Sequence, residues 1–524
     1  MGVRDFRHYG APPAWRRIEA AERSGAHVSG LPGASAMTPV ATGAMSDADS
    51  LLWTIGRDPV LRMTVVAVAV LDRAPRWKRL RTRVDDLTRM LPRLRSRAIP
   101  RTFGWWRPRW EEDGRFDLDL HLRRVRAAPP ARLRTVLDMA QAMATTGFDP
   151  QLPLWEAVVV EELEDGRAAV VLKFHRALAD EVGGIAVLVH LLEGERTPRH
   201  QGRAPVRDVR RATRVPANLP PDSRPDDLRS PGPTWRAHEL LSRDRTPEMS
   251  ARPPGFLESA IEAVARSARY PSERVAGALV GASSIAKLLA PARRPQSALM
   301  SGRSIGRQFE VIDLPPGALH RAAGAVGGAL NDVFVAGIVT GLRRYHELHG
   351  AKVDRLRVLM PVSVRREGHP LAPAHFALVR YVLPVPGDAA ACVEEVRKIT
   401  SRYEHDRALA LSDAVATGLD LLPPPLATAV WGAILKGDDF CVTRVPGPPS
   451  ETYLAGARVE GLYAFAPPSG AAMNVSLLTP TRRESVDVNF EFVGLNIDSA
   501  AVPDGSKLVA CLEAGFGDVL CLAS

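Results

Sequence analysis

The sequence has few cysteines and no long apolar run, and both features narrow the kind of protein it can be. Four cysteines are too few and too widely separated to predict a disulfide framework or a zinc site. Their positions are Cys392, Cys441, Cys511 and Cys521. No apolar stretch approaches the about 20 residues of a membrane-spanning helix, and Met63–Leu71 has only the length of a strand. We therefore expect a protein of the reducing cytoplasm, either soluble or peripheral to a membrane or lipid droplet.

Motifs of several common function classes are also missing. The sequence has no Gly-rich phosphate loop, no nucleophile elbow and no basic stretch interleaved with aromatic residues, which argues against kinases, serine hydrolases and nucleic-acid-binding proteins. The net charge of +10 comes from 69 Lys and Arg residues against 59 Asp and Glu residues. It is consistent with arginine-rich solvated faces, or with a surface that meets lipid head groups or a phosphorylated cofactor.

The chain is too long for one core, and its pattern predicts two α/β units in tandem. In the first unit, Met63–Leu71 reads as a strand buried on both faces, and residues 76–90 carry a helical apolar stripe. Residues 155–163 and 168–174 read as a hairpin, followed by a short helix that ends at Gly194. The second unit begins near Gln308 and again alternates strands with helices.

This pattern predicts five segments. We expect a disordered N-terminal extension over 1–45, with Met37 or Met45 as alternative starts, and a first domain over 46–194. An Arg- and Pro-rich stretch with little apolar content predicts a disordered linker over 195–254. A connecting helical region over 255–304 and a second domain over 305–524 complete the chain.

The stretch VLKFHRALADEVGG (residues 171–184) is the best candidate for a site. It places His175 at the end of a predicted strand, and Asp180 follows in the loop. Strand ends in α/β proteins are common ligand positions, and a neutral imidazole accepts a proton near neutral pH. A buried histidine bonded to the backbone explains the same pattern, so both interpretations stay open. Gly183 and Gly184 fit either a helix-entry turn or a close approach to a ligand.

The KFHRALADEVGG segment resembles the K-x-H-H-A-L-x-D-G-x-x-G motif of the bacterial wax ester synthase/acyl-CoA:diacylglycerol acyltransferase (WS/DGAT) family. The resemblance covers residues 46–520 in the family's order. Further matching segments are MSDADSLLWTIGRDPVLRM, PLWEAVVVEEL, LNDVFVAGIVTGLRRY, LMPVSVR and TRVPGPP. It implies two chloramphenicol-acetyltransferase-like domains around a central tunnel. It also implies transfer of an acyl group from acyl-CoA to diacylglycerol or a long-chain alcohol, with acyl-CoA as co-substrate and no other cofactor or metal.

Carried over residue by residue, the motif is degenerate. His175 matches the first histidine of the family motif, and Arg176 stands at the second, which is the family's base. Asp180 matches the aspartate, and Glu181 replaces the glycine. An arginine keeps its proton at any working pH, so Arg176 cannot act as that base. Arg444 departs in the same way from the Asn that usually precedes Val-Pro-Gly-Pro.

Three explanations of this departure stay open. In the first, Arg176 pairs with Asp180 or Glu181, and the protein is a non-catalytic relative that binds lipid or acyl-CoA. In the second, His175 or Glu181 serves as the base of a weak or altered acyltransferase. In the third, the scaffold carries an unrelated function. The candidate substrate-binding residues are Gly184, Asn331, Asp332, Pro446 and Gly447. Asn331 and Asp332 fit either a helix cap or the tunnel wall, and the oligomeric state stays undetermined.

Overall fold

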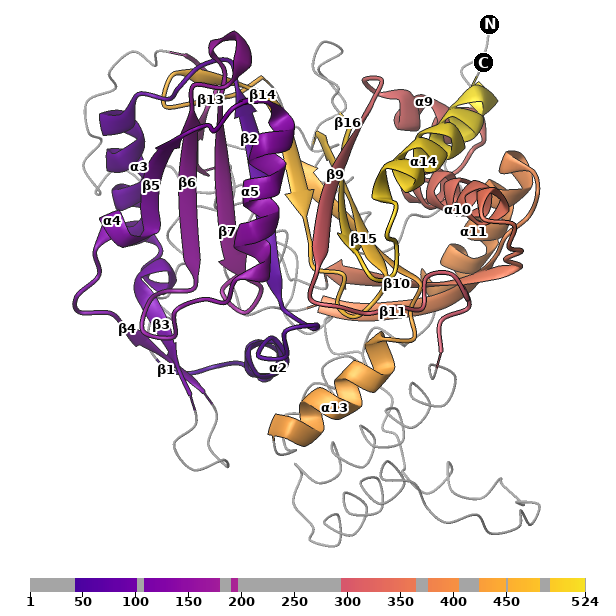
Figure 1. The fold of residues 1–524 in the computed structure, drawn as a ribbon, viewed down its shortest axis with the longest axis horizontal. Coiled ribbons are helices and arrows are strands. Elements are labelled where there is room, and N and C mark those ends of the chain that lie inside the picture. Colours follow the sequence, from indigo (N-terminus) through magenta and orange to yellow (C-terminus); the bar gives the residue numbers. More distant parts are fainter. Residues whose placement is uncertain are drawn as a thin grey trace, which may run out of the picture.

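The computed structural model describes residues 43–100, 108–179, 190–196, 294–363, 376–404, 424–448, 451–480 and 491–523. These residues form two α/β bodies that lie side by side, each built on one large sheet (Figure 1). The predicted disordered segments lie largely outside the described residues. Residues 294–304, the last part of the predicted connecting helices, form turns and irregular structure instead of a helix.

The first body is a seven-stranded sheet with helices on both faces. Its strand order is β5 (Leu122–Arg126), β6 (Trp155–Glu161), β7 (Ala168–His175), β2 (Thr64–Leu71), β14 (Ala457–Phe465), β13 (Tyr453–Leu454) and β8 (Leu192–Glu193). The helices of this body are α2 (Asp47–Ile55), α3 (Trp77–Met90), α4 (Leu118–His121) and α5 (Leu133–Thr145). A small sheet of β1 (Gly43–Ala44), β4 (Arg109–Glu112) and β3 (Ser96–Ile99) lies beside it.

Strand β2 shows why the first sheet needs two helical layers. All eight of its residues are buried. Val65 belongs to the same core cluster as Leu80 of α3, whereas Val66 belongs to the cluster of Val136 on α5. Successive side chains of a strand point to opposite faces, so an unbroken apolar strand requires a cover on each side. The predicted doubly buried strand, the helix of residues 76–90 and the β6–β7 hairpin are confirmed.

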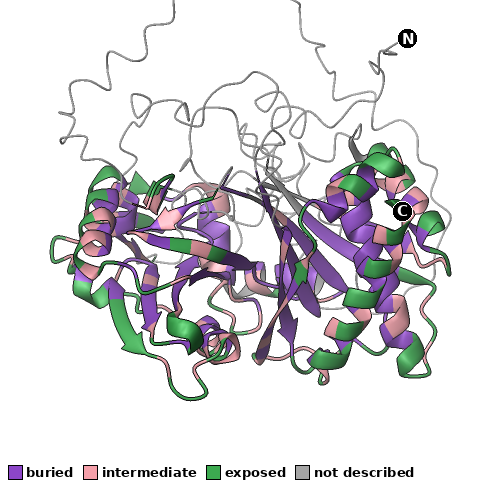
Figure 2. Ribbon diagram, turned by 90° about the horizontal axis from the view of Figure 1, so that it is seen from above, coloured by how far each residue is buried: buried purple, intermediate pink, exposed green. Residues whose placement is uncertain are grey.

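The second body is a six-stranded sheet covered by helices on its outer face. Its strand order is β11 (Phe376–Pro384), β10 (Arg355–Ser363), β12 (Phe440–Gly447), β15 (Met473–Pro480), β16 (Glu491–Asp498) and β9 (Arg307–Leu314). The helices of that face are α9 (Ala318–Ala325), α10 (Leu330–Leu348), α11 (Ala389–Glu404) and α14 (Gly505–Leu520). Helix α13 (Pro424–Leu435) lies apart from them and contacts α2 of the first body. Figure 2 shows the strands largely buried and the helices exposed along their outer sides.

Strand β14 crosses from the second half of the chain into the first sheet. It pairs antiparallel with β2, and its neighbour β13 pairs with β8. From this position, the Phe465 ring stacks on Phe309 of β9 at 4.3 Å between centroids, and the Tyr463 hydroxyl donates to Asp313 at 2.8 Å. The predicted division of the chain at residue 305 did not include this exchange. The helix predicted to reach Gly194 ends earlier, because Leu192 and Glu193 form β8.

Among the described residues, no single helix is both long and apolar enough to cross a bilayer. Helices α9 and α10 taken together satisfy the length and composition, but they bend by 103° where they meet. Most residues of α10 are buried in the core of the second body.

Candidate active site at the end of strand β7

His175 is the last residue of β7, and three contacts fix its position. Its N–H donates to the Leu154 carbonyl at 3.0 Å, and it lies opposite Thr64 in the register of β7 with β2. The Ala177 N–H donates to Nδ1 of the imidazole at 3.0 Å. Because that lone pair is engaged, the neutral ring carries its proton on Nε2.

The surroundings of His175 are apolar. The ring meets the edges of Trp53 on α2 and of Phe148, with centroids 5.6 and 5.8 Å away. Its side chain is buried, and burial lowers the pKa of His175 to about 3. The histidine is therefore neutral at physiological pH, and its described geometry leaves no lone pair free to accept a substrate proton.

Gly56 allows α2 to approach the imidazole closely. It is the C-cap residue of α2, and a Cβ at this position would lie 2.7 Å from Nε2 of His175. Glycine is therefore needed here for close packing, since its backbone conformation is ordinary right-handed helix. The sequence indicates a helix end at Gly56, but its contact with a residue 119 positions away is invisible in the sequence.

Arg176 turns from the first sheet toward the second. Its N–H donates to the Met63 carbonyl at 2.8 Å, and the residue is 3% exposed. Its positive charge opposes the rise that burial causes in the pKa of Cys441, so the guanidinium lies near β12. Arg176 is thus a buried cation at the boundary of the two bodies.

An ion pair between a buried lysine and a partly exposed glutamate links the motif strand to β6. Lys173 is 1% exposed, and its ammonium donates to Glu156 on β6 at 2.7 Å. The same ammonium lies 4.4 Å from the ring centroid of Phe148, which touches His175. Burial lowers the pKa of Lys173, and the Glu156 carboxylate opposes that shift. The lysine therefore connects the strand to the loop that encloses the histidine.

The other predicted site residues are distributed over the molecule. Asp180, Glu181 and Gly184 lie outside the described residues, and so does the predicted pairing of Arg176 with the acids. Gly447 is buried at the end of β12, in the second sheet. The backbone of Pro446 pairs there with Thr479, and its side chain is not among those described.

Asp332 serves the start of α10, in the outer helical layer (Figure 1). Its carboxylate accepts the Ala329 N–H at 3.0 Å and the Thr400 hydroxyl at 2.9 Å, and burial raises its pKa. The N-cap residue is Ala329, so neither Asn331 nor Asp332 occupies the N-cap position. Asp332 instead stabilises the first turn from its third residue.

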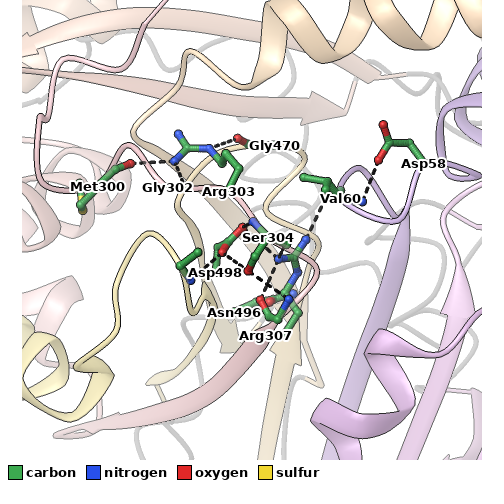
Figure 3. A network of polar contacts seen from close by, with 12 residues as sticks. Asp58, Val60, Met300, Gly302, Arg303, Ser304, Arg307, Gly470, Asn496 and Asp498 are labelled. Carbon is green, nitrogen blue, oxygen red and sulfur yellow. Dashed lines mark hydrogen bonds and ion pairs between the residues drawn. The ribbon is translucent and has the colours of Figure 1, made fainter.

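A polar network joins the two bodies close to this site (Figure 3). Arg307 of β9 donates to the Val60 carbonyl at 2.9 Å and to Asp498 at 3.2 Å. Arg303 donates to backbone carbonyls of two separate loops, at Gly470 and Asp438. These contacts hold the segment before β9 against both bodies.

The sequence matches the models of one protein family over most of its length. Residues 45–334 match the wax ester synthase/diacylglycerol acyltransferase catalytic domain, and residues 374–519 match the WS/DGAT C-terminal domain. A Mycobacterium tuberculosis protein named "Putative diacyglycerol O-acyltransferase Rv2484c" is 32% identical over 93% of this chain and 94% of its own length.

Two groups of solved structures share the fold. The wax ester synthase/diacylglycerol acyltransferase from Marinobacter aquaeolei VT8 superposes with a TM-score of 0.58, at 17% identity over 92% of this chain and all of that one. The first condensation domain of the calcium-dependent antibiotic synthetase gives 0.53, at 16% identity over 93% and 97%. The predicted fold of two chloramphenicol-acetyltransferase-like domains is confirmed. The chain belongs to the wax ester synthase/diacylglycerol acyltransferase family.

Proposed function

We propose that the protein binds acyl-CoA and a hydrophobic alcohol or diacylglycerol and transfers the acyl group between them slowly. In this reaction the hydroxyl oxygen attacks the thioester carbonyl, a C–O bond forms, the C–S bond breaks, and the hydroxyl proton ends on the CoA thiol. The family supports the substrate classes. The slow rate is inferred from Arg176, which is buried at the position of the family's base.

Arg176 changes what the site contributes to this reaction. A guanidinium does not accept the hydroxyl proton, and a general base typically supplies about 100- to 10,000-fold in rate. The cation still favours negative charge that develops on the thioester oxygen. Positioning the two substrates also lowers the barrier without a base. The expected outcome is measurable transfer at a small fraction of the rate of a family member with two histidines.

A second candidate function is binding of acyl-CoA or lipid without turnover. The engaged Nδ1 of His175 favours it, because the first histidine of the motif offers no substitute for the missing base. Both candidates predict binding of palmitoyl-CoA, and they differ in product.

The test is a single-turnover assay with labelled palmitoyl-CoA and, in parallel, dioctanoylglycerol or hexadecanol. Slow appearance of triacylglycerol or wax ester supports transfer. Saturable palmitoyl-CoA binding without any ester supports the binding function. An absence of palmitoyl-CoA binding contradicts both and favours an unrelated function on this scaffold.

We also propose that the protein works at a lipid surface in the cytoplasm, since both expected substrates carry long hydrocarbon chains. Co-flotation with vesicles that contain dioctanoylglycerol is the expected result. Recovery only in the soluble fraction would contradict this location.

A further inference from the structure

A small polar cavity lies between the two bodies, beside the start of β2. The first body contributes Arg62 and Thr64 to its lining, and the second contributes Arg307 and Asn496. The enclosed part measures about 10 Å³, which is close to the space of one water-sized oxygen. Thr64 lies opposite His175 in the β2–β7 register, so the cavity adjoins the strand end that carries the motif.

Two of the residues that line the cavity, Arg62 and Asn496, each carry a buried polar atom. Nη1 of Arg62 and Oδ1 of Asn496 are buried, and neither has a hydrogen-bond partner within the described part of the chain. Asn496 is 3% exposed, and its Nδ2 donates to the Ala466 carbonyl at 3.0 Å. That bond fixes the orientation of the amide and leaves Oδ1 as an acceptor. Buried groups of this kind are costly unless a partner satisfies them.

The neighbouring charges are already paired. Arg307 is held by Asp498 and the Val60 carbonyl, as Figure 3 shows, and Lys173 is held by Glu156. Both cations have unfavourable electrostatic interactions with Arg62. A carboxylate or phosphate would place a lone pair against Oδ1 of Asn496. A hydroxyl matches both groups, because its oxygen accepts one hydrogen bond and its proton donates another.

The remaining lining is suited to an alkyl chain. Ile305 is 60% exposed, and it lines the same cavity together with Pro59, Pro467 and Pro468. A water molecule would contact only the polar groups of the cavity. A fatty alcohol would contact these groups through its hydroxyl and the apolar residues through its alkyl chain.

We propose that this cavity seats the hydroxyl group of the alcohol acceptor, between Arg62 and Asn496. The inference rests on the proposed function and assigns the acceptor's hydroxyl to a definite place in it. Arg62 is then a binding residue for the alcohol, and the family motif lies on the adjoining strand.

The experiment compares two ligands in four proteins. Competition against radiolabelled 1-dodecanol in equilibrium dialysis gives affinities for 1-dodecanol and for 1-chlorododecane, which has a similar shape and no hydroxyl. The proteins are the full-length chain, R62M, R62K and the control R89M, since Arg89 is an exposed arginine of α3 with a side chain 66% exposed. The quantity of interest is the ratio of the two affinities, because a general loss of packing lowers both together.

We expect the unmodified protein and R89M to prefer the alcohol by about 10-fold, the effect of one or two net hydrogen bonds. R62M loses this preference, and R62K, which keeps a donor, regains part of it. Equal affinities in the unmodified protein, or no alcohol binding, would overturn the proposal and leave the cavity to water. A preference that R62M retains would place the hydroxyl elsewhere. Palmitoyl-CoA binding, measured in parallel, tests the proposed function separately.

Discussion

At the scale of single residues, burial determines what His175 and Arg176 can do. The imidazole is enclosed by Trp53, Phe148 and Gly56, and it accepts a backbone N–H through Nδ1. The enclosure disfavours the charged ring, and the hydrogen bond holds the neutral one in a single tautomer. Arg176 carries a permanent charge into the boundary with β12. In this geometry neither side chain offers a free lone pair to a proton, because Nδ1 of His175 is engaged and a guanidinium does not accept one.

This arrangement predicts a dependence of stability on pH. The folded pKa of His175 is lowered to about 3 from an ordinary 6.5. The unfolded chain thus takes up a proton first as the pH falls. The stabilisation from the neutral ring is complete above about pH 6.5 and is lost toward about pH 3, by about 1.4 kcal/mol per pH unit.

Replacing His175 by asparagine keeps a hydrogen-bond acceptor near the position of Nδ1 but removes the titratable group. Urea unfolding at several pH values between 7.5 and 4.5 should show a steeper loss of stability for the unmodified protein than for H175N. Parallel losses in the two proteins would show that another group causes the dependence.

At the scale of elements, the close approach of α2 to β7 is the feature that encloses the motif. The C-cap N–H of Gly56 donates to the Leu52 carbonyl, and its Cα faces the imidazole. The sequence predicts the strand and the helix from their apolar periods, since these depend on neighbouring residues. It does not predict which glycine faces which ring, because that contact depends on how the layers pack.

Alanine at Gly56 should destabilise the protein by about 1–3 kcal/mol, because its Cβ has no room beside the His175 ring. Gly517, in α14, is the matched control, since a Cβ there meets nothing within 4 Å. G517A should raise stability by about 0.5–1 kcal/mol. Urea unfolding of both variants measures the difference. A G56A variant as stable as the unmodified protein would contradict the close packing of α2 on the histidine.

The sequence also predicts those parts of the site that are close together in the chain, and it misses those that packing brings together. His175 and Arg176 were found in the sequence because they belong to a contiguous motif. Arg62 and Asn496 lie 434 positions apart, and only the pairing of the two bodies brings them to one cavity. Asp332 was identified as a cap or tunnel residue, and the structure shows its bond to Ala329, a contact three positions away.

At the scale of the whole molecule, β14 makes the two bodies interdependent. Its hydrogen bonds belong to the first sheet, whereas its aromatic side chains contact β9 of the second. Two consecutive α/β patterns predicted separate domains, and no local signal in residues 457–465 indicates the sheet they join. Without this strand, the edge of β2 would be exposed as an unpaired ladder.

Because β14 belongs to the first sheet and packs on the second, we expect the two bodies to unfold together. We expect calorimetry of the full chain to give one unfolding transition, and residues 43–196 expressed alone to lack a stable fold. Replacing Phe465 by alanine should lower the melting temperature of that single transition, because it removes a buried ring that packs between the bodies. Two separated transitions, or a folded 43–196 fragment, would contradict the interdependence.

The central claim is that Arg176 limits acyl transfer, and the rate of a single variant tests it most directly. The measurement is the single-turnover rate of ester formation from palmitoyl-CoA and hexadecanol for the unmodified protein, R176H, R176Q and the double variant R176H/E181G. Histidine at position 176 restores a proton acceptor, so R176H, or the double variant if Glu181 obstructs the site, should exceed the unmodified protein by about 100-fold or more. R176Q, which removes the charge and supplies no base, should show no gain. Fast transfer by the unmodified protein, or histidine variants no faster than R176Q, would contradict the account.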